Sequence, residues 1–349
     1  MSIYGAIDVS MKECHLCLMN SNRSIVFEAC VESTPQAIDQ CLREADVKPD
    51  AVEQIVIESG RGVPFIFHGL RDLGWSLLGV DSVHAHALLK SKRLHKTDKN
   101  DARGLAEFAL AGAHRAIHIK SLDAHALRAQ LCAREKLLKC RVGLENNIRA
   151  LCSTFGIVIG AKSGKAFEAA AKDALRIDGL AQSVAALMQA RAAMIAQISE
   201  LTKQLRTIAS SRCETKRLME IPGVGPLTAL CFIATLDDLS RFKKARDVGV
   251  FLGLVPKRHQ SGSVDYTSGI TKRGDGRLKR LLYEAANSIL VRSKIDTSLQ
   301  RWAKRIAQRK GLKKARIALA RKLSIVMQAM VVDGTFFDPF PNKATSHGH

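Results

Sequence analysis

The chain has 349 residues, and its 54 lysines and arginines against 33 acidic residues give a net charge of +21. A protein this basic normally binds a polyanion, and 46% hydrophobic residues exclude a disordered tail. No uncharged apolar run reaches the roughly 18–20 residues that span a bilayer. We therefore expect no membrane partner, and nine scattered cysteines favour a reducing cytoplasm over a disulfide framework.

The first 118 residues are predicted to form an α/β domain. Apolar runs predict strands at 3–9, 15–19, 24–30, 54–58 and 75–80, and amphipathic runs predict helices at 35–45, 65–73, 83–90 and 98–111. Alternating strands and helices indicate a sheet that is at least partly parallel. Residues 1–58 are acidic, with four basic and ten acidic side chains, so this end does not bind the polyanion directly.

Residues 119–212 are predicted to form a helical coiled-coil segment. An apolar heptad with Arg191 at one a position occupies its second half, and glycines at 156, 160 and 164 separate it from an earlier apolar stripe. The heptad comprises Val184, Leu187, Met194, Ile198, Leu201, Leu205 and Ile208. The partner helix lies either in the same chain or in a second copy, and the pattern leaves both possibilities open.

Residues 213–335 are predicted to be mainly α-helical and basic, with residues 336–349 as a C-terminal tail. Residues 241–322 alone contain 23 basic and five acidic side chains. Such a region neutralises phosphates and releases counterions, which is the main source of sequence-independent affinity for nucleic acid. Within it, Lys313, Lys314 and Arg316 form a basic cluster.

Four carboxylates in the first domain form a candidate metal site. Asp8 lies in an apolar strand, Glu58 ends the strand QIVIE, and Asp98 and Asp101 lie three residues apart at a helix start. Hard cations such as Mg²⁺ or Mn²⁺ prefer oxygen ligands of this kind. The alternative is that Asp98 and Asp101 only favour the helix N-terminus and that Asp8 faces solvent.

Two glycine-rich segments lie in the basic region. Ile221–Gly225 (IPGVG) between two helices fits a helix–hairpin–helix, whose Gly223 and Gly225 would let backbone N–H groups approach a phosphate, or else an ordinary turn. Residues 257–277 form a predicted loop, and its cations are Lys257, Arg258, Lys272, Arg273 and Arg277. This loop either holds a phosphate near a serine nucleophile or is a flexible basic segment.

In combination these motifs resemble one family, the DEDD-type insertion-sequence transposases related to the Piv DNA invertase, which are RNA-guided recombinases. The resemblance covers nearly the whole chain: Asp8, Glu58, KTDKNDARGLAEF, the helical insert, IPGVG, FLGLVPKRHQSGS and LKRLLYEAA follow in the family's order. One departure is the sequence Glu-Ser-Gly-Arg from Glu58, where members often have Glu-Ala-Thr/Cys-Gly.

The resemblance implies a RuvC-like (RNase H) fold for the first domain and a serine nucleophile in the C-terminal one. By residue-for-residue match the serine is Ser261, with Ser263 as the neighbouring alternative. The implied reaction cuts and rejoins DNA through a phosphoserine, with Mg²⁺ or Mn²⁺ on the acidic tetrad. The implied partners are double-stranded donor and target DNA, a noncoding guide RNA from the element, and further copies in a dimer or tetramer at the nucleoid.

Two other functions fit the same motifs. A Holliday-junction-type endonuclease would use the tetrad with water as the nucleophile. A non-catalytic nucleic-acid-binding scaffold would use the helix–hairpin–helix and the basic helices alone. Ser261 separates the first two functions, and the four carboxylates separate both from the third.

Overall fold

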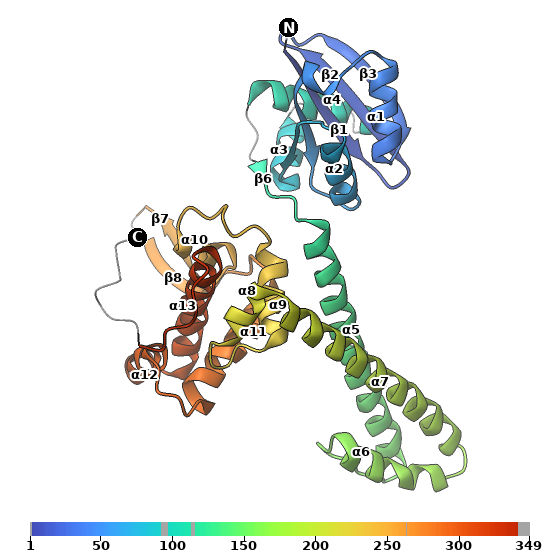
Figure 1. Cartoon of the computed structure of the whole chain (residues 1–349). Coiled ribbons are helices and arrows are strands. Elements are labelled where there is room, and N and C mark those ends of the chain that lie inside the picture. Colours follow the sequence, from blue (N-terminus) through green and yellow to red (C-terminus); the bar gives the residue numbers. More distant parts are fainter. Residues whose placement is uncertain (1, 92–96, 113–115, 263, 341–349) are drawn as a thin grey trace. The chain divides into compact units, whose positions relative to one another are not determined.

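The computed structural model of the chain describes residues 2–91, 97–112, 116–262 and 264–340. The chain divides into two compact units, unit 1 at Met1–Asp123 and unit 2 at Ala124–His349 (Figure 1). Within the described residues no helix is long and apolar enough to cross a membrane.

Unit 1 is built on a mixed sheet whose described strands follow the order β3-β2-β1-β4-β5-β6. The strands are β1 Ile3–Val9, β2 Glu13–Asn20, β3 Ile25–Glu32, β4 Val52–Glu58, β5 Leu77–Val80 and β6 Ala116–Ile117. The first three strands form an antiparallel meander, β1, β4 and β5 are parallel, and β6 is antiparallel. The predicted mixed α/β domain is confirmed, although β6 was not predicted.

Helices cover both faces of this sheet. They are α1 Pro35–Glu44, η1 Pro49–Ala51, α2 Val63–Asp72, α3 Ser82–Ser91 and α4 Asp98–Ala111. One core contains Ile38 of α1 and Leu70 of α2, together with Ile7 and Ile57 of the sheet. The other core packs α4 onto the opposite face, where small alanines let the helix approach the strands closely. Unit 1 is therefore a three-layer α/β/α structure.

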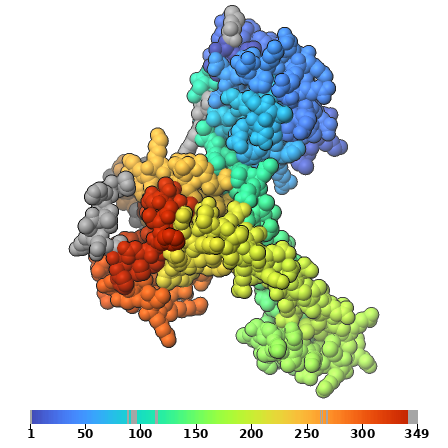
Figure 2. All heavy atoms as spheres, viewed as in Figure 1, coloured from blue at the N-terminus to red at the C-terminus, as the bar shows by residue number. Residues whose placement is uncertain are grey.

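Two long helices, α5 Leu122–Thr154 and α7 Ala181–Ser211, lie side by side in unit 2 and are joined by α6 Gly164–Ala171 and η2 Lys172–Arg176. The tip around α6 has its own small core and forms a separate lobe (Figure 2). The guanidinium of Arg191 is 1% exposed and binds Glu145 of α5 at 2.8 Å and Glu168 of α6 at 2.7 Å. The heptad of α7 therefore packs within the chain.

The rest of unit 2 is mainly helical, as predicted. Its helices are α8 Cys213–Met219, α9 Pro226–Leu236, α10 Ala245–Phe251, α11 Gly276–Asn287, η3 Ser288–Arg292, α12 Ser298–Lys310 and α13 Leu312–Val332. The almost wholly buried α9 lies at the centre of the core. Residues 333–340 return to the body, where the Pro339 carbonyl accepts from Ser298 N at 2.9 Å. The predicted tail residues 341–349 lie outside the described residues.

The predicted loop at 257–277 is wrong over most of its length. Residues 256–270 form an antiparallel hairpin of β7 Pro256–Ser261 and β8 Val264–Ile270. Cross-strand contacts stabilise it: the rings of His259 and Tyr266 stack with centroids 5.0 Å apart, and Arg258 binds Asp265 at 2.6 Å. Cross-strand side-chain pairs of this kind stabilise β-sheets. Here they take the place of the alternating apolar residues that this sequence lacks.

Candidate functional site

Two of the predicted carboxylates lie at the same end of the unit 1 sheet. Ile7 pairs with Ile57 between the parallel strands β1 and β4, so Asp8 and Glu58 each follow a paired residue. Side chains alternate along a strand. Ile7 and Ile57 belong to the core that contains α1 and α2, and therefore Asp8 and Glu58 project on the opposite face, where α4 lies.

The start of α4 brings two more carboxylates to this end. Thr97 caps the helix, because its hydroxyl accepts from Asn100 N at 3.2 Å, and Asp98 and Asp101 follow in the first turn. One oxygen from each of Asp8, Asp98 and Asp101 lies within 4.8 Å of the others. Glu58 does not belong to this close group. The structure thus brings three of the four predicted carboxylates together.

The three-aspartate cluster fits a divalent cation by its chemistry. All three side chains offer oxygen, which is the donor that Mg²⁺ and Mn²⁺ select. Asp8 and Asp101 are half-buried and Asp98 is exposed, so a solvated ion has access to the cluster. Glu58 ends the neighbouring strand on the same face of the sheet.

An ion-pair clamp holds the first turns of α4 against the sheet. Glu28 of β3 binds Arg103 through two oxygens, with Nη2 to Oε2 at 2.7 Å, and it also binds Lys99 at 3.3 Å. The Arg103 hydrogen bond, opposed by partial burial, holds the pKa of Glu28 below its usual range. Lys99 lies between Asp98 and Asp101, and Arg103 lies two residues after Asp101, so the clamp positions these aspartates.

Replacing Glu28 by glutamine should release the clamp without changing the shape of the side chain. We expect the affinity of the cluster for Mn²⁺ to fall about 10–100-fold, as for the loss of residues that orient metal ligands. Because the folded pKa of Glu28 is depressed, the clamp should stabilise unit 1 above the usual glutamate range and weaken as pH falls through the folded value. Titration calorimetry and acid melts measure both effects. A control variant is Glu44→Gln on α1. Equal Mn²⁺ affinity in the two variants would contradict the role of the clamp in positioning the aspartates.

The predicted nucleophile ends strand β7. Ser261 pairs with Val264 across a tight turn, in which Gly262 has φ +54°, a left-handed conformation suited to glycine. Ser263 lies outside the described residues.

The segment after the hairpin is fixed to the helical body. The Lys279 ammonium donates to the Thr271 and Arg273 carbonyls at 3.2 and 2.8 Å. Gly274 has φ +82°, and a Cβ there would lie 2.4 Å from the Leu252 carbonyl oxygen. Asp275 then caps α11 and receives Arg128 at 3.0 Å. The hairpin therefore extends from a rigid base.

The predicted phosphate-binding cations differ in their surroundings. Lys272, Arg273, Lys313 and Lys314 are exposed, whereas Lys257 is half-buried. Arg258 pairs with Asp265, Arg277 with Glu135 and the Cys132 sulfur, and Arg316 with the Tyr283 hydroxyl at 3.3 Å. These three exposed lysines and one exposed arginine are thus the best placed to meet a polyanion, and the paired arginines also stabilise the fold.

The two glycines of the IPGVG turn have different environments. Gly223 has φ +85°, and a Cβ there would lie 2.9 Å from the Ala285 carbonyl oxygen of α11. Gly225 precedes Pro226 at the start of α9, and a Cβ there would meet nothing within 4 Å. Gly223 therefore serves close packing, and Gly225 leaves the N-terminus of α9 accessible.

Two family models match separate stretches of the chain. Residues 6–155 match the DEDD transposase model of IS110 elements, and residues 215–303 match the model described as transposase IS116/IS110/IS902 family. The transposase for insertion sequence element IS1111A of Coxiella burnetii is 28% identical over 284 residues, 79% of this chain and 77% of that protein.

Two further relatives extend the comparison. The transposase for insertion sequence element IS1328 of Yersinia enterocolitica is 26% identical over 286 residues, which cover 81% of this chain and 85% of that protein. The pilin gene-inverting protein of Moraxella lacunata is 32% identical over 123 residues, 35% of this chain and 38% of that protein.

Proposed function

Because this chain belongs to the IS110/IS116 family of transposases, enzymes that cut and rejoin DNA for an insertion sequence, we propose that it works through a serine-linked intermediate and a metal-binding tetrad. The observation that carries the proposal is the cluster of Asp8, Asp98 and Asp101, since it fits the metal site that a DEDD transposase needs. In this scheme residues 1–118 hold the metal, 119–212 form the helical insert and 213–335 supply the serine.

The strand order of unit 1 supports a RuvC-like fold. An antiparallel β1–β2–β3 meander followed by parallel β4 and β5, with α4 over the ends of β1 and β4, places acidic residues of three elements at one edge. Asp8, Asp98 and Asp101, joined by Glu58, would hold Mg²⁺ or Mn²⁺. A bound cation of this kind neutralises charge that develops on the phosphate and polarises it for attack.

The proposed serine reaction needs no external energy source, because each phosphodiester bond that breaks is replaced by another. The Ser261 oxygen attacks phosphorus and loses its proton, while the bond from phosphorus to the 3′ oxygen breaks and that oxygen takes up a proton. The products are a phosphoserine diester and a free 3′-hydroxyl. Attack of another strand's 3′-hydroxyl on the diester restores the DNA backbone and frees Ser261.

The basic region would bind the nucleic acids. Exposed Lys272, Arg273, Lys313 and Lys314 would contact phosphates, and the IPGVG turn would act as a helix–hairpin–helix through Gly225 at the start of α9. We assign sequence choice to a noncoding guide RNA that pairs with donor and target DNA, so that the protein reads backbone and shape. The protein would act at the nucleoid of a prokaryotic cell.

The half-buried apolar stripe of α7 supports assembly into a dimer or tetramer. Met194, Ile198 and Leu201 remain only half-buried in the single chain, although Val184 and Leu205 are fully buried. A heptad that is incompletely covered by its partner helix can accept a second copy. The mass of the protein in light scattering measures this directly.

The function is tested by joining donor and target DNA with purified protein. We expect strand exchange only when Mg²⁺ or Mn²⁺ and the noncoding RNA of the element's end are both present. A control reaction contains an RNA whose loops are scrambled but whose length is equal. Exchange that proceeds equally with the scrambled RNA would contradict guidance, and hydrolysis without joining would favour the endonuclease function.

A further inference from the structure

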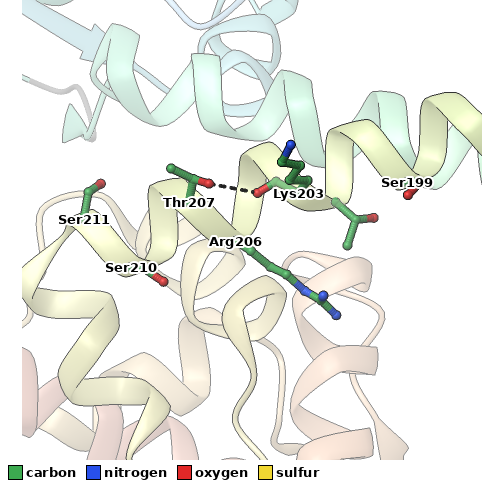
Figure 3. A pocket seen from close by; sticks show the side chains of 7 residues that line it. Ser199, Lys203, Arg206, Thr207, Ser210 and Ser211 are labelled. Carbon is green, nitrogen blue, oxygen red and sulfur yellow. Dashed lines mark hydrogen bonds between the residues drawn. The ribbon is translucent and has the colours of Figure 1, made fainter.

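An open groove of about 780 Å³ runs along helix α7, and its lining residues are distant in sequence from the predicted serine and carboxylates. Seven residues line it, all from α7: the cations Lys203 and Arg206 and five serines and threonines. No carboxylate lines this groove, and its hydroxyls lie along the helix between Ser199 and Ser211 (Figure 3). Hydroxyls and cations together are the side chains that contact phosphate oxygens.

The groove cations lack ion-pair partners within the described part of the chain. Several cations elsewhere on the α5–α7 hairpin are paired: Arg191 binds two glutamates, and Lys139 binds Glu135. A smaller adjoining groove contains Glu200, whose carboxylate accepts from Gln204 at 2.9 Å. Lys203 lines both grooves, whereas Arg206 lines only the larger one, which has no carboxylate.

A third cation adds to this charge from helix α5. Arg134 donates from Nε to the Thr202 hydroxyl at 2.7 Å and has no ion pair among the described residues. Burial, followed by repulsion from Arg206, lowers the pKa of Arg134. Two guanidiniums held near each other without a carboxylate favour the arrival of an anion.

We propose that the groove residues Lys203 and Arg206, with Arg134 beside them, form a second nucleic-acid-binding site that holds a phosphodiester backbone. The proposal rests on the transposase function only in that the protein handles DNA and RNA. Lys203 and Arg206 extend in different directions from α7 (Figure 3). Their divergence fits a ligand with charges spaced along its length, such as a strand, better than one compact anion.

The test measures binding of the full chain to DNA and RNA duplexes of equal length and random sequence over a range of salt concentrations. The variant is Lys203→Gln with Arg206→Gln, and the matched control is Lys165→Gln with Arg176→Gln, which removes the same charge from exposed sites at the tip. We expect the groove variant to bind every sequence more weakly. On the DNA duplex the slope of log K against log salt should become shallower by about 0.9 for each lost phosphate contact.

The outcomes separate the groove from the catalytic mechanism. Weaker binding of DNA alone or of RNA alone identifies which backbone occupies the groove, and retention of binding by Lys203→Arg with Arg206→Lys shows that charge is responsible. If the wild type binds and the groove and control variants have equal affinity and slope on both duplexes, the groove proposal fails while the transposase mechanism stands. If the wild type binds neither duplex, both fail.

Discussion

Replacing Asp98 or Asp101 by asparagine is expected to abolish strand cleavage while nucleic-acid binding stays close to wild type. The substitution keeps the size of the side chain but removes a charged ligand from the group of oxygens that lie within 4.8 Å of one another. Loss of a residue that only supports a metal ligand costs about 10–100-fold, so we expect loss of a ligand itself to exceed 100-fold. The rate of cleavage in Mg²⁺ measures the effect. Asp8→Asn and Glu58→Gln should behave in the same way.

A matched control for these variants lies on the other face of the same sheet. Asp39 of α1 accepts from the Trp75 indole at 2.8 Å and pairs with Arg43, and Asp39→Asn retains an acceptor for the indole. This variant should cleave at the wild-type rate. Wild-type recombination by both Asp98→Asn and Asp101→Asn would show that the aspartates only favour the start of α4, the alternative that the sequence left open.

The architecture of unit 1 could be predicted because local sequence patterns indicate the strands and helices that form its core. Strands such as Ile3–Val9 and Val52–Glu58 are short apolar runs, and α4 starts at a Thr cap followed by two aspartates. The convergence of Asp8, Glu58, Asp98 and Asp101 was predicted from their places in two strands and a helix start, together with the family resemblance. The structure places these three side chains close to one another.

The hairpin at 256–270 and the clamp on α4 could not be predicted from local sequence. The strand segment Lys257–Gln260 is polar throughout, so its pairing depends on Tyr266 and Asp265 across the hairpin. Glu28 and Arg103 are separated by 75 residues, and no local pattern links them. In both cases the information lies in a contact between segments.

The heptad of α7 is another case in which the sequence pattern does not reveal the partner segment. The sequence predicted the apolar seam but not the helix that covers it, and the structure supplies α5 of the same chain. A buried arginine at the a position is costly unless it is paired. Glu145 and Glu168 provide that pairing from two other helices, which the spacing within α7 does not reveal.

Replacing Ser261 by alanine is expected to abolish both recombination and a covalent protein–DNA adduct, while RNA and DNA binding persists. The wild-type protein, given guide RNA and a DNA substrate, should form an adduct that survives denaturation, because a phosphoserine diester is a covalent bond. Its mass should map to the peptide that contains Ser261. The exposed cations Lys272 and Arg273 follow the hairpin on a fixed base, so binding does not depend on the hydroxyl.

Ser263→Ala is the matched control, since it removes a serine hydroxyl two residues further along the sequence. This variant should keep the adduct and the recombination rate, and an adduct mapped to Ser263 would transfer the nucleophile's role to that residue. Cleavage by Ser261→Ala and Ser263→Ala together at the wild-type rate would identify water as the nucleophile. The acidic cluster would then serve an endonuclease, because the three aspartates support attack by water as well as by serine, and only the covalent intermediate distinguishes the two reactions.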